Sequence, residues 1–200
     1  MPENSTNSRI LFSRFFGVLV LALLLVADRR YSHGVSGAVW NLLGLAVIIV
    51  AALGRVWTSS YLAAYKDVRL ICYGPFSVTR NPLYLFTLMA AVGIGMTAAS
   101  LIIFLLAIVI VAVTHVVAVN NEEARLAELF GEEYEDYKKS VPRYWPKLKQ
   151  YNSPKIIFVH TKIYGRAFFD AAGWPAVYLG LRAIDLLHAQ GVVPTLLEIP

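Results

Sequence analysis

The sequence predicts an all-α integral membrane protein with four transmembrane helices, cytoplasmic C-terminal helices, and an interfacial or fifth membrane helix in the tail. Hydrophobic residues make up 58% of the 200 residues and charged residues only 16%. The mean hydropathy of +0.59 is too high for an ordinary soluble domain. The charges are clustered, and the uncharged stretches between them approach the roughly 20 residues that a helix needs to cross a bilayer.

Four apolar stretches are the candidate membrane-spanning helices. In the first, Arg14 lies within the opening turns, from which its side chain can snorkel to the interface. A cleaved signal peptide is the alternative for this stretch, but the stretch lacks a clear cleavage site between small residues and runs into charges at residues 28–30. The four stretches cover residues 10–27, 37–53, 83–99 and 101–119.

The third and fourth stretches are separated only by Ala99 and Ser100. We therefore expect a tight antiparallel hairpin whose two ends return to the same membrane face. Gly93 and Gly95 in the third stretch would let the helices approach closely, because glycine leaves the backbone uncovered. The polar segments before and after the hairpin should consequently meet at one lipid–water boundary.

The distribution of Lys and Arg predicts which face of the membrane carries the polar segments. Residues 55–80 contain four basic residues and residues 122–166 contain nine, whereas Arg29 and Arg30 would lie on the opposite side. The positive-inside rule then places both basic segments in the cytoplasm. We expect a bacterial inner membrane protein in contact with membrane lipids. The net charge of +5 comes without any nucleic-acid-binding motif, so no nucleic acid partner is expected.

The helix of the fourth stretch should continue into water as far as Phe130. Gly131 would end it, because glycine adopts a left-handed conformation without a Cβ penalty. A second short helix is predicted over residues 132–140 and is stopped by Pro142. We divide the chain into N-terminal membrane helices (1–57), a central core (58–150) and a C-terminal extension (151–200).

The tail over residues 165–190 has a broad apolar surface that is interrupted by charges. Arg182 and Asp185 are three residues apart, so they can pair on one helical face. Pro175 would kink a helix here. The tail is predicted to lie at the interface or to pack on the bundle, and a fifth span is the alternative.

A turn and a helix start precede the third stretch. Pro82 fits the first helical position, where no backbone N–H is required, and Asn81 then falls at the N-cap, where its side chain can satisfy an unpaired amide. A purely structural turn would explain these residues. The functional interpretation is that the positive end of this helix attracts a carboxylate, which Arg80 would also bind by a bidentate hydrogen bond.

Two acidic residues, Glu122 and Glu123, follow the fourth stretch. They could be a solvated helix end. They also lie where the hairpin returns beside the loop that contains Asn81, and acids near a helix C-terminal end oppose the macrodipole. A carboxylate at this place could hold the amino group of a bound amino acid or a ribose hydroxyl.

Two tyrosines and one histidine are further candidate site residues. Tyr134 and Tyr137 share a helical face, where they either wall an adenine ring or dock the short helix onto the membrane. His115 lies within the fourth stretch and is either functional or a neutral residue bonded to a neighbouring helix. The single Cys72 has no partner for a disulfide or for a cysteine-based metal site, and the other histidines show no metal spacing, so no metal is expected.

The order of these motifs resembles the isoprenylcysteine carboxyl methyltransferase family, which is related to the membrane phospholipid methyltransferases. The resemblance covers residues 73–147. It consists of Gly-Pro-Phe-x-x-x-Arg-Asn-Pro-x-Tyr from Gly74, a hydrophobic hairpin, and Glu-Glu-x-x-Leu-x-x-x-Phe-Gly-Glu-Glu-Tyr-x-x-Tyr-Lys-Lys-x-Val-Pro from Glu122.

The resemblance implies a membrane methyltransferase that uses S-adenosylmethionine without a Rossmann domain. It implies that Arg80, Asn81 and Glu123 serve at the reacting centre. The cofactor contacts that it implies are Tyr73, Gly74, Pro75, Arg80, Asn81, Pro82, Tyr84, Leu85, Glu122, Glu123, Tyr134 and Tyr137.

This chain has Asn81 where the family usually has histidine. Asn cannot titrate near neutral pH, so a base at this position is absent. A carboxylate acceptor is already ionised at neutral pH and needs no base. We therefore expect carboxyl O-methylation of an isoprenylcysteine-like, lipophilic acceptor that enters from the bilayer. The alternatives are N-methylation of a phospholipid head group and a non-catalytic membrane scaffold.

Overall fold

The computed structural model describes residues 27–29, 34–63, 65, 67–98, 100–193 and 197–199. Apart from Ala27, the predicted first span and its signal-peptide alternative lie outside these residues. The helices are α2 (Gly34–Leu62), α3 (Pro82–Thr97), α4 (Leu101–Ser140) and α5 (Thr161–Ala189), with short 3₁₀ turns η1 (Gly74–Ser77) and η2 (Leu148–Gln150) and strands β1 (Ala27–Arg29) and β2 (Leu197–Ile199).

The described part of the chain is predominantly helical, as the sequence predicts. Two helices are long and apolar enough to cross a membrane, namely Val35–Leu62 and Phe104–Ser140, and Pro82–Thr97 is apolar but shorter. The second predicted span is extended, because α2 continues beyond Leu53 to Leu62. The division at residues 57 and 58 therefore falls within a continuous helix, and the domain boundaries stay predictions.

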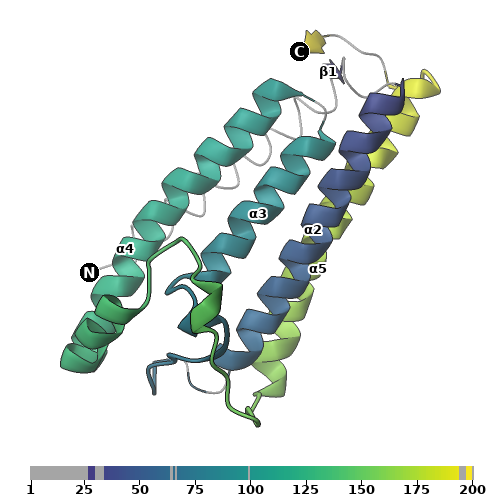
Figure 1. Ribbon diagram of the computed structural model, residues 1–200. Coiled ribbons are helices and arrows are strands. Elements are labelled where there is room, and N and C mark those ends of the chain that lie inside the picture. Colours follow the sequence, from purple (N-terminus) through teal and green to yellow (C-terminus); the bar gives the residue numbers. More distant parts are fainter. Residues whose placement is uncertain are drawn as a thin grey trace, which may run out of the picture.

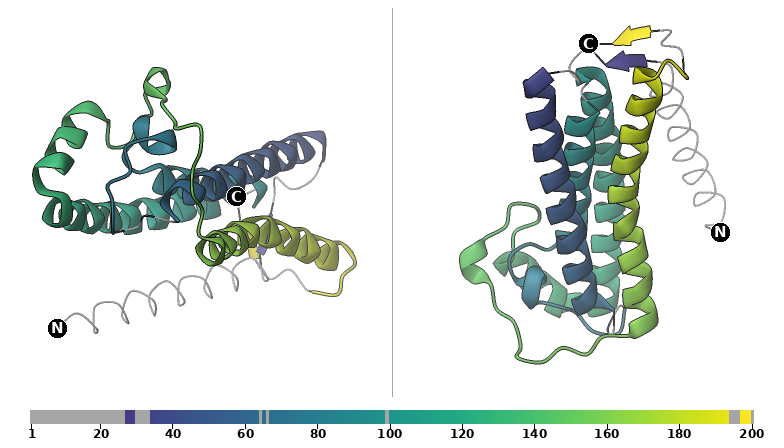
Figure 2. Two further views of the ribbon diagram at one scale, coloured as in Figure 1. Left: turned by 90° about the horizontal axis from the view of Figure 1, so that it is seen from below. Right: turned by 90° about the vertical axis from the view of Figure 1, so that its right-hand side faces the viewer.

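The four helices α2 to α5 lie side by side and alternate in direction (Figure 1). The long segments that follow α2 and α4 lie at the same end of the bundle (Figure 1). Helix α3 packs between α2 and α4, while α5 runs along α2 and also contacts α3. Seen from the side, α5 follows α2 over most of its length (Figure 2). The tail therefore packs on the bundle along α2, an arrangement that a fifth span would share, and whether α5 crosses the membrane stays a prediction.

A pair of three-residue strands was not predicted. Strand β1 pairs in parallel with β2, with Ala27 opposite Leu197 and Arg29 opposite Ile199. The pair lies at the end of the bundle where α2 begins and α5 ends (Figure 2). Strands this short have no alternation of apolar and polar residues that could be recognised in the sequence. The pairing joins segments from the two ends of the described chain.

Glycines allow the close helix packing that the sequence predicts. A Cβ atom on Gly93 would lie 2.8 Å from the carbonyl oxygen of Gly44, and one on Gly44 would lie 2.7 Å from the carbonyl oxygen of Gly93. A Cβ on Gly95 would lie 2.6 Å from the ring of Phe104. Helices α2, α3 and α4 consequently approach each other at positions where any side chain would clash.

The end of α3 is held by α5. Arg182 donates a hydrogen bond of 2.6 Å to the carbonyl of Thr97, the last residue of α3. A cation at this position satisfies a terminal carbonyl and complements the negative end of the helix. The predicted pair of Arg182 and Asp185 is confirmed, with 2.9 Å between Nη1 and Oδ2.

Helix α4 changes direction at Gly131, as predicted. This residue has φ 49° and ψ −120° inside an otherwise helical run. The short segment after it turns back and buries Tyr134 and Tyr137 against Leu70 and Val141. The tyrosines therefore dock this segment onto the protein itself.

The segment after α4 passes around the loop that precedes α3. We call residues 141–153 the strap. The backbone N–H of Arg80 donates to Pro142 and that of Lys147 donates to Val78, both at 2.9 Å. The backbone N–H of Gly74 donates to the carbonyl of Asn152 in the strap at 2.6 Å. Gly74 has φ +62°, and the ring of Tyr61 packs against its backbone. The loop is therefore fixed by backbone bonds to a distant segment.

Replacing Gly93 with Ala should lower the stability of the bundle. The added methyl group meets a carbonyl oxygen of α2, which cannot move without shifting the helix, and overpacking of this kind costs about 1–3 kcal/mol. The midpoint of thermal unfolding in detergent would report the loss. Gly180→Ala in α5 is the control, because nothing lies within 4 Å of a Cβ there. Equal midpoints for the two variants would contradict close packing at Gly93.

The two docking tyrosines should respond differently to loss of the hydroxyl. Tyr137 donates a 2.7 Å hydrogen bond to the carbonyl of Phe76, so Tyr137→Phe should cost about 1 kcal/mol. The hydroxyl of Tyr134 is buried and has no hydrogen-bond partner in the described part of the chain, so Tyr134→Phe should be neutral or stabilising. Thermal unfolding of both variants measures the difference, and the reverse order would contradict this packing.

Candidate functional site

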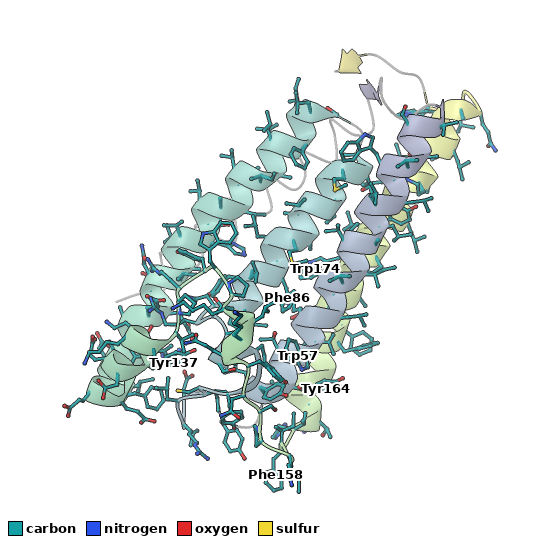
Figure 3. The ribbon with its side chains drawn as sticks, in the orientation of Figure 1. Trp57, Phe86, Tyr137, Phe158, Tyr164 and Trp174 are labelled. Atoms are coloured by element: carbon teal, nitrogen blue, oxygen red, sulfur yellow. The ribbon has the colours of Figure 1, made fainter. Side chains whose placement is uncertain are left out.

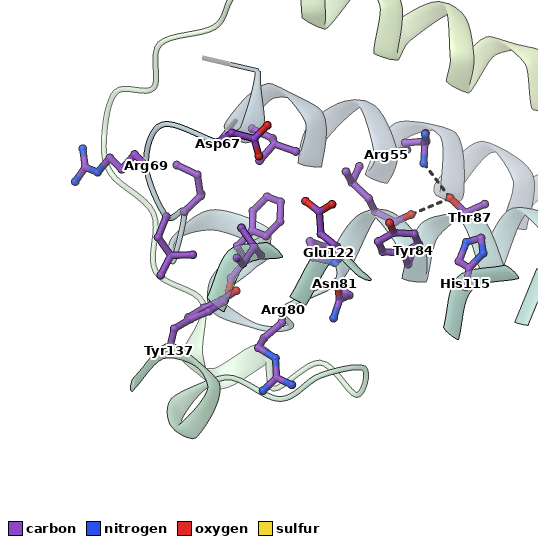
Figure 4. Close-up of a pocket in the computed structure, with 17 residues that line it drawn as sticks. Arg55, Asp67, Arg69, Arg80, Asn81, Tyr84, Thr87, His115, Glu122 and Tyr137 are labelled. Atoms are coloured by element: carbon purple, nitrogen blue, oxygen red, sulfur yellow. Dashed lines mark hydrogen bonds between the residues drawn. The ribbon is translucent and has the colours of Figure 1, made fainter. Parts of the chain in front are cut away.

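A cavity of about 350 Å³ lies at the end of the bundle where α2 ends and α3 begins (Figure 4). Its volume falls in the range of roughly 300–1,000 Å³ that is usual for small-molecule sites. Its walls come from α2, the loop before α3, the first turns of α3, and α4. The side chains with polar groups that line it are Arg55, Asp67, Arg69, Arg80, Asn81, Tyr84, Thr87, His115, Glu122 and Tyr137.

Arg80 and Glu123 meet at this end of the bundle, as the hairpin prediction requires. Arg80 Nε lies 3.2 Å from Glu123 Oε1, and Nη2 lies 3.4 Å from Oε2, so the pair is bidentate. Their side chains are only 12% and 14% exposed. An ion pair with this little exposure is stable only when its remaining polar atoms are also bonded.

The remaining donors of Arg80 are used by the protein. Nη1 donates to the carbonyl of Lys138 at 3.1 Å and to that of Val141 at 3.2 Å. We expected this guanidinium to bind the carboxylate of a ligand. In the structure the Nε and Nη2 atoms of Arg80 are bound to the carboxylate of Glu123. Arg80 therefore joins the loop before α3 to α4.

Asn81 has a different role from the one predicted for its side chain. It occupies the N-cap position of α3, and Pro82 is the first helical residue as expected, but the Asn81 side chain makes no capping hydrogen bond. Its Nδ2 donates to Glu123 Oε1 at 3.0 Å and to the carbonyl of Arg143 at 3.3 Å. The prediction of a side-chain cap is wrong, because the nearby carboxylate takes the amide donor.

Arg143 is a contact of Glu123 that was missed at the sequence level. Its Nε lies 3.3 Å from Glu123 Oε2, and its Nη2 donates to the side chain of Asn120. The only signal in the sequence was a basic residue directly after the Val-Pro pair of the strap. Glu123 is thus bound by Arg80 and Asn81, which are consecutive residues at the end of the loop before α3, and by Arg143 in the strap.

The adjacent acid, Glu122, is in a different environment. It lines the cavity, whereas Glu123 does not. Within the described residues Glu122 takes part in no ion pair, although Arg80 and Arg143 pair with its neighbour. Asp67 also lines the cavity but pairs with Arg125 at 2.8 Å, so Glu122 is the acid of the cavity wall that is left without an ion pair among the described residues.

Arg55 is a second missed residue, and it enters the cavity from the apolar part of α2. Its Nη1 donates to the hydroxyl of Thr87 at 2.9 Å, and Thr87 in turn donates to the carbonyl of Leu83 (Figure 4). The guanidinium also lies 5.5 Å from the ring centre of Trp174 on α5. A cation inside an apolar helix was the available signal.

Aromatic residues form another part of the wall. The rings of Tyr84 and His115 meet edge to face with 5.0 Å between centres. Nε2 of His115 is buried without a hydrogen-bond partner among the residues described. Nε2 therefore makes no bond to a neighbouring helix within the described residues, and His115 packs on Tyr84 of α3 through its ring.

Tyr137 reaches the cavity from beyond the break in α4 (Figure 3). Burial raises the pKa of its phenol far above the ordinary value, because the charged phenolate is disfavoured away from water. Burial is the largest effect on this pKa, and the charge of Glu123 raises it further while that of Arg80 lowers it. Tyr137 therefore stays protonated and keeps donating to Phe76. This bond fixes the loop that forms the adjacent wall.

The structure divides the twelve predicted site residues into two groups. Six line the cavity: Arg80, Asn81, Pro82, Tyr84, Glu122 and Tyr137. The other six do not, and they are Tyr73, Gly74, Pro75, Leu85, Glu123 and Tyr134. Members of the second group support the first, since Gly74 is bonded to the strap, Glu123 holds Arg80, and Tyr134 is in the core.

The cavity offers two kinds of surface. Its polar part has an acid in Glu122 and the positive end of α3, which begins at Pro82. Its other part consists of apolar and aromatic side chains. Nowhere in the described segments do three His, Cys, Asp or Glu side chains group as they would around a metal ion. The arrangement is therefore suited to an organic ligand with both charged and apolar parts.

Comparison with known proteins identifies related chains. The cobalt-zinc-cadmium resistance protein CzcN of Cupriavidus metallidurans is 27% identical over 188 residues, which cover 94% of this chain and 87% of that protein. The nickel-cobalt-cadmium resistance protein NccN of Alcaligenes xylosoxydans xylosoxydans is 24% identical over 195 residues, covering 98% and 91%. No solved structure matches.

The phospholipid methyltransferase family matches residues 35–133. This range includes α3, nearly all of α2, most of α4 and the loop before α3, and every residue that lines the cavity except Tyr137 lies in it. Residues 35–133 are therefore a domain of the phospholipid methyltransferase family, and this family belongs with the isoprenylcysteine carboxyl methyltransferase-like proteins that the motifs of the chain resemble.

Proposed function

We propose that this protein is an S-adenosylmethionine-dependent methyltransferase of the bacterial inner membrane that acts on a lipophilic acceptor, with its active site facing the cytoplasm. The observation that carries the proposal is the cavity at the end of the hairpin. It combines a carboxylate without an ion-pair partner among the described residues, Glu122, with aromatic and apolar walls next to the membrane helices. The methyltransferase family domain over residues 35–133 supports the reaction class.

The residues of the cavity fit the cofactor. Glu122 would hold the ammonium group or a ribose hydroxyl, and the positive end of α3 at Pro82 would attract the carboxylate. Arg55, which has no carboxylate partner among the described residues, would leave a guanidinium beside the cofactor that is open to an anionic acceptor. When bound, the cofactor supplies an electrophilic methyl group whose carbon–sulfur bond breaks, with its electron pair going to sulfur, as the bond to the acceptor forms.

The chemistry of the lining favours an acceptor that is already ionised. Near the loop Asn81 cannot act as a base, so an acceptor that must first lose a proton would be at a disadvantage. A carboxylate oxygen is anionic at neutral pH and needs only alignment with the methyl group and exclusion of water. Carboxyl O-methylation of an isoprenylcysteine-like molecule is therefore our first choice of reaction.

The distribution of charge supports the orientation. Basic residues gather in the loop before α3, in the strap and at the start of α5, all at the cavity end of the bundle (Figure 1). The opposite end has few basic residues in the described part of the chain. By the positive-inside rule the cavity then opens toward the cytoplasm, where the cofactor is available.

The names of the two relatives concern metal resistance, and they belong to those proteins. The described side chains include no group of three possible metal ligands. We assign the cavity to an organic cofactor and its acceptor because of its lining and of the methyltransferase family domain that forms it.

An assay on membranes that contain the protein tests the proposed reaction. S-adenosylmethionine with a radiolabelled methyl group should transfer label to a lipid-soluble product, and mild base should release the label if the product is an ester. Label that resists base and stays in phospholipid head groups would indicate N-methylation instead. Absence of both labelling and cofactor binding by calorimetry would support the scaffold alternative and overturn the proposal.

Glu122→Gln should weaken cofactor binding about 10- to 100-fold, since a hydrogen bond to a charged group contributes roughly 1.5–3 kcal/mol. Its thermal midpoint should stay near that of the parent, because Glu122 makes no ion pair within the described residues. Isothermal titration calorimetry with S-adenosylmethionine measures the affinity. Glu128→Gln, an exposed acid on the same helix, is the matched control. Equal affinity of the two variants would remove Glu122 from the site.

A further inference from the structure

A second cavity of about 200 Å³ lies between α2 and α5. Helix α2 contributes Ser59, and α5 contributes Ile163, Arg166 and Asp170. None of these residues belongs to the motifs that resemble the methyltransferase family. The cavity lies at the same end of the bundle as the larger one, beside the last two turns of α2 and the first turns of α5 (Figure 1).

Arg55 connects the two cavities, because it lines both of them. Its guanidinium is fixed between three helices by the hydroxyl of Thr87 on α3 and by the ring of Trp174 on α5. Leu62 also lines both cavities. A ligand in the smaller cavity would therefore be separated from a ligand in the larger one by little more than these two side chains.

The charges of the smaller cavity are unbalanced. It contains the cations Arg55 and Arg166 and one acid, Asp170, which leaves one net positive charge. Neither arginine forms an ion pair with a carboxylate in the part of the chain that the structure describes. Asp170 and Arg166 are exposed on α5, whereas Arg55 is partly buried within the apolar helix α2. A cation at such a depth is expected to have an anionic partner.

The smaller cavity also has an apolar part. It is lined by Leu62 and Ala63 at the end of α2 and by Ile163 and Ala167 on α5, and Ile163 is 43% exposed. Side chains of this kind on membrane helices face lipid chains. An occupant of the cavity would thus have its charged group beside Arg55 and an apolar part along α2 and α5.

We propose that the cavity between α2 and α5 binds the acidic head group, phosphate or carboxylate, of a membrane amphiphile, and that Arg55 presents this group to the larger cavity. The inference rests on the proposed function, because it takes the larger cavity as the cofactor site. It makes the methyl acceptor an anionic amphiphile that approaches between α2 and α5. Arg166 is then a specificity residue for the acid, and Asp170 disfavours head groups with more than one negative charge.

Retention of lipid by the full-length protein tests the proposal. The protein would be reconstituted in nanodiscs with equal amounts of phosphatidylglycerol and phosphatidylcholine that have identical chains, and the bound lipid would be measured by native mass spectrometry. We expect preferential retention of phosphatidylglycerol, and a loss of this preference by about tenfold in Arg55→Gln and in Arg166→Gln, as for one charge-assisted hydrogen bond.

Lys162→Gln is the matched control. It removes the same charge from the same helix one turn before Arg166, at a position that does not line the cavity, and it should change the preference by less than about twofold. Equal loss of preference in Lys162→Gln and Arg166→Gln would overturn the proposal, because it would indicate general attraction to a basic surface. Displacement of the lipid by millimolar inorganic phosphate would overturn the assignment to an amphiphile.

Cofactor binding separates this inference from the proposed function. Arg166→Gln should bind S-adenosylmethionine with the affinity of the parent, since Arg166 does not line the larger cavity. A parent protein that binds the cofactor but retains both lipids equally would refute the anionic acceptor alone. A parent protein that prefers phosphatidylglycerol but does not bind the cofactor would refute the methyltransferase function alone. Thermal midpoints near that of the parent would show that each variant is folded.

Discussion

The buried carboxylate of Glu123 holds together the end of the bundle where both cavities lie. It accepts a bidentate pair from Arg80, an amide hydrogen bond from Asn81, and an ion pair from Arg143. These partners come from the loop before α3, the N-terminus of α3, and the strap. Removing one partner from a buried ionic cluster leaves an uncompensated charge and commonly costs about 3–5 kcal/mol. The cluster therefore fixes the loop before α3, helix α4 and the strap relative to one another.

The same cluster determines which charges remain open to a ligand. Glu123 satisfies Arg80, so the motif arginine serves the protein, while Glu122, one residue earlier on α4, is directed to the cavity. Arg55, which the family motif does not include, lines the cavity without a carboxylate partner in the described chain. Adjacent residues on one helix thus have different tasks, because a rotation of about 100° per residue turns them to different neighbours.

Helix α5 lies outside the family domain and forms one wall of the smaller cavity. It follows α2 closely, and Arg182 holds the end of α3 from the side opposite the cavities. At its other end α5 brings Trp174 against Arg55 and forms the second cavity with α2. Contacts at both ends fix its position along the bundle. Under the proposed function, this extension would influence which acceptors approach the methyltransferase family domain.

Local patterns determined much of this protein without reference to the fold. Apolar length predicted the helices α2, α3 and α4, the two-residue gap predicted the hairpin, and Gly131 predicted the break in α4, because each follows from neighbouring residues alone. The hairpin also predicted that Arg80 and Glu123 would meet. Only the tertiary structure decided how the charges pair, where α5 lies, and that Asn81 binds Glu123 instead of capping α3. These outcomes depend on which distant side chains compete for one donor or acceptor, and sequence spacing contains no information about that competition.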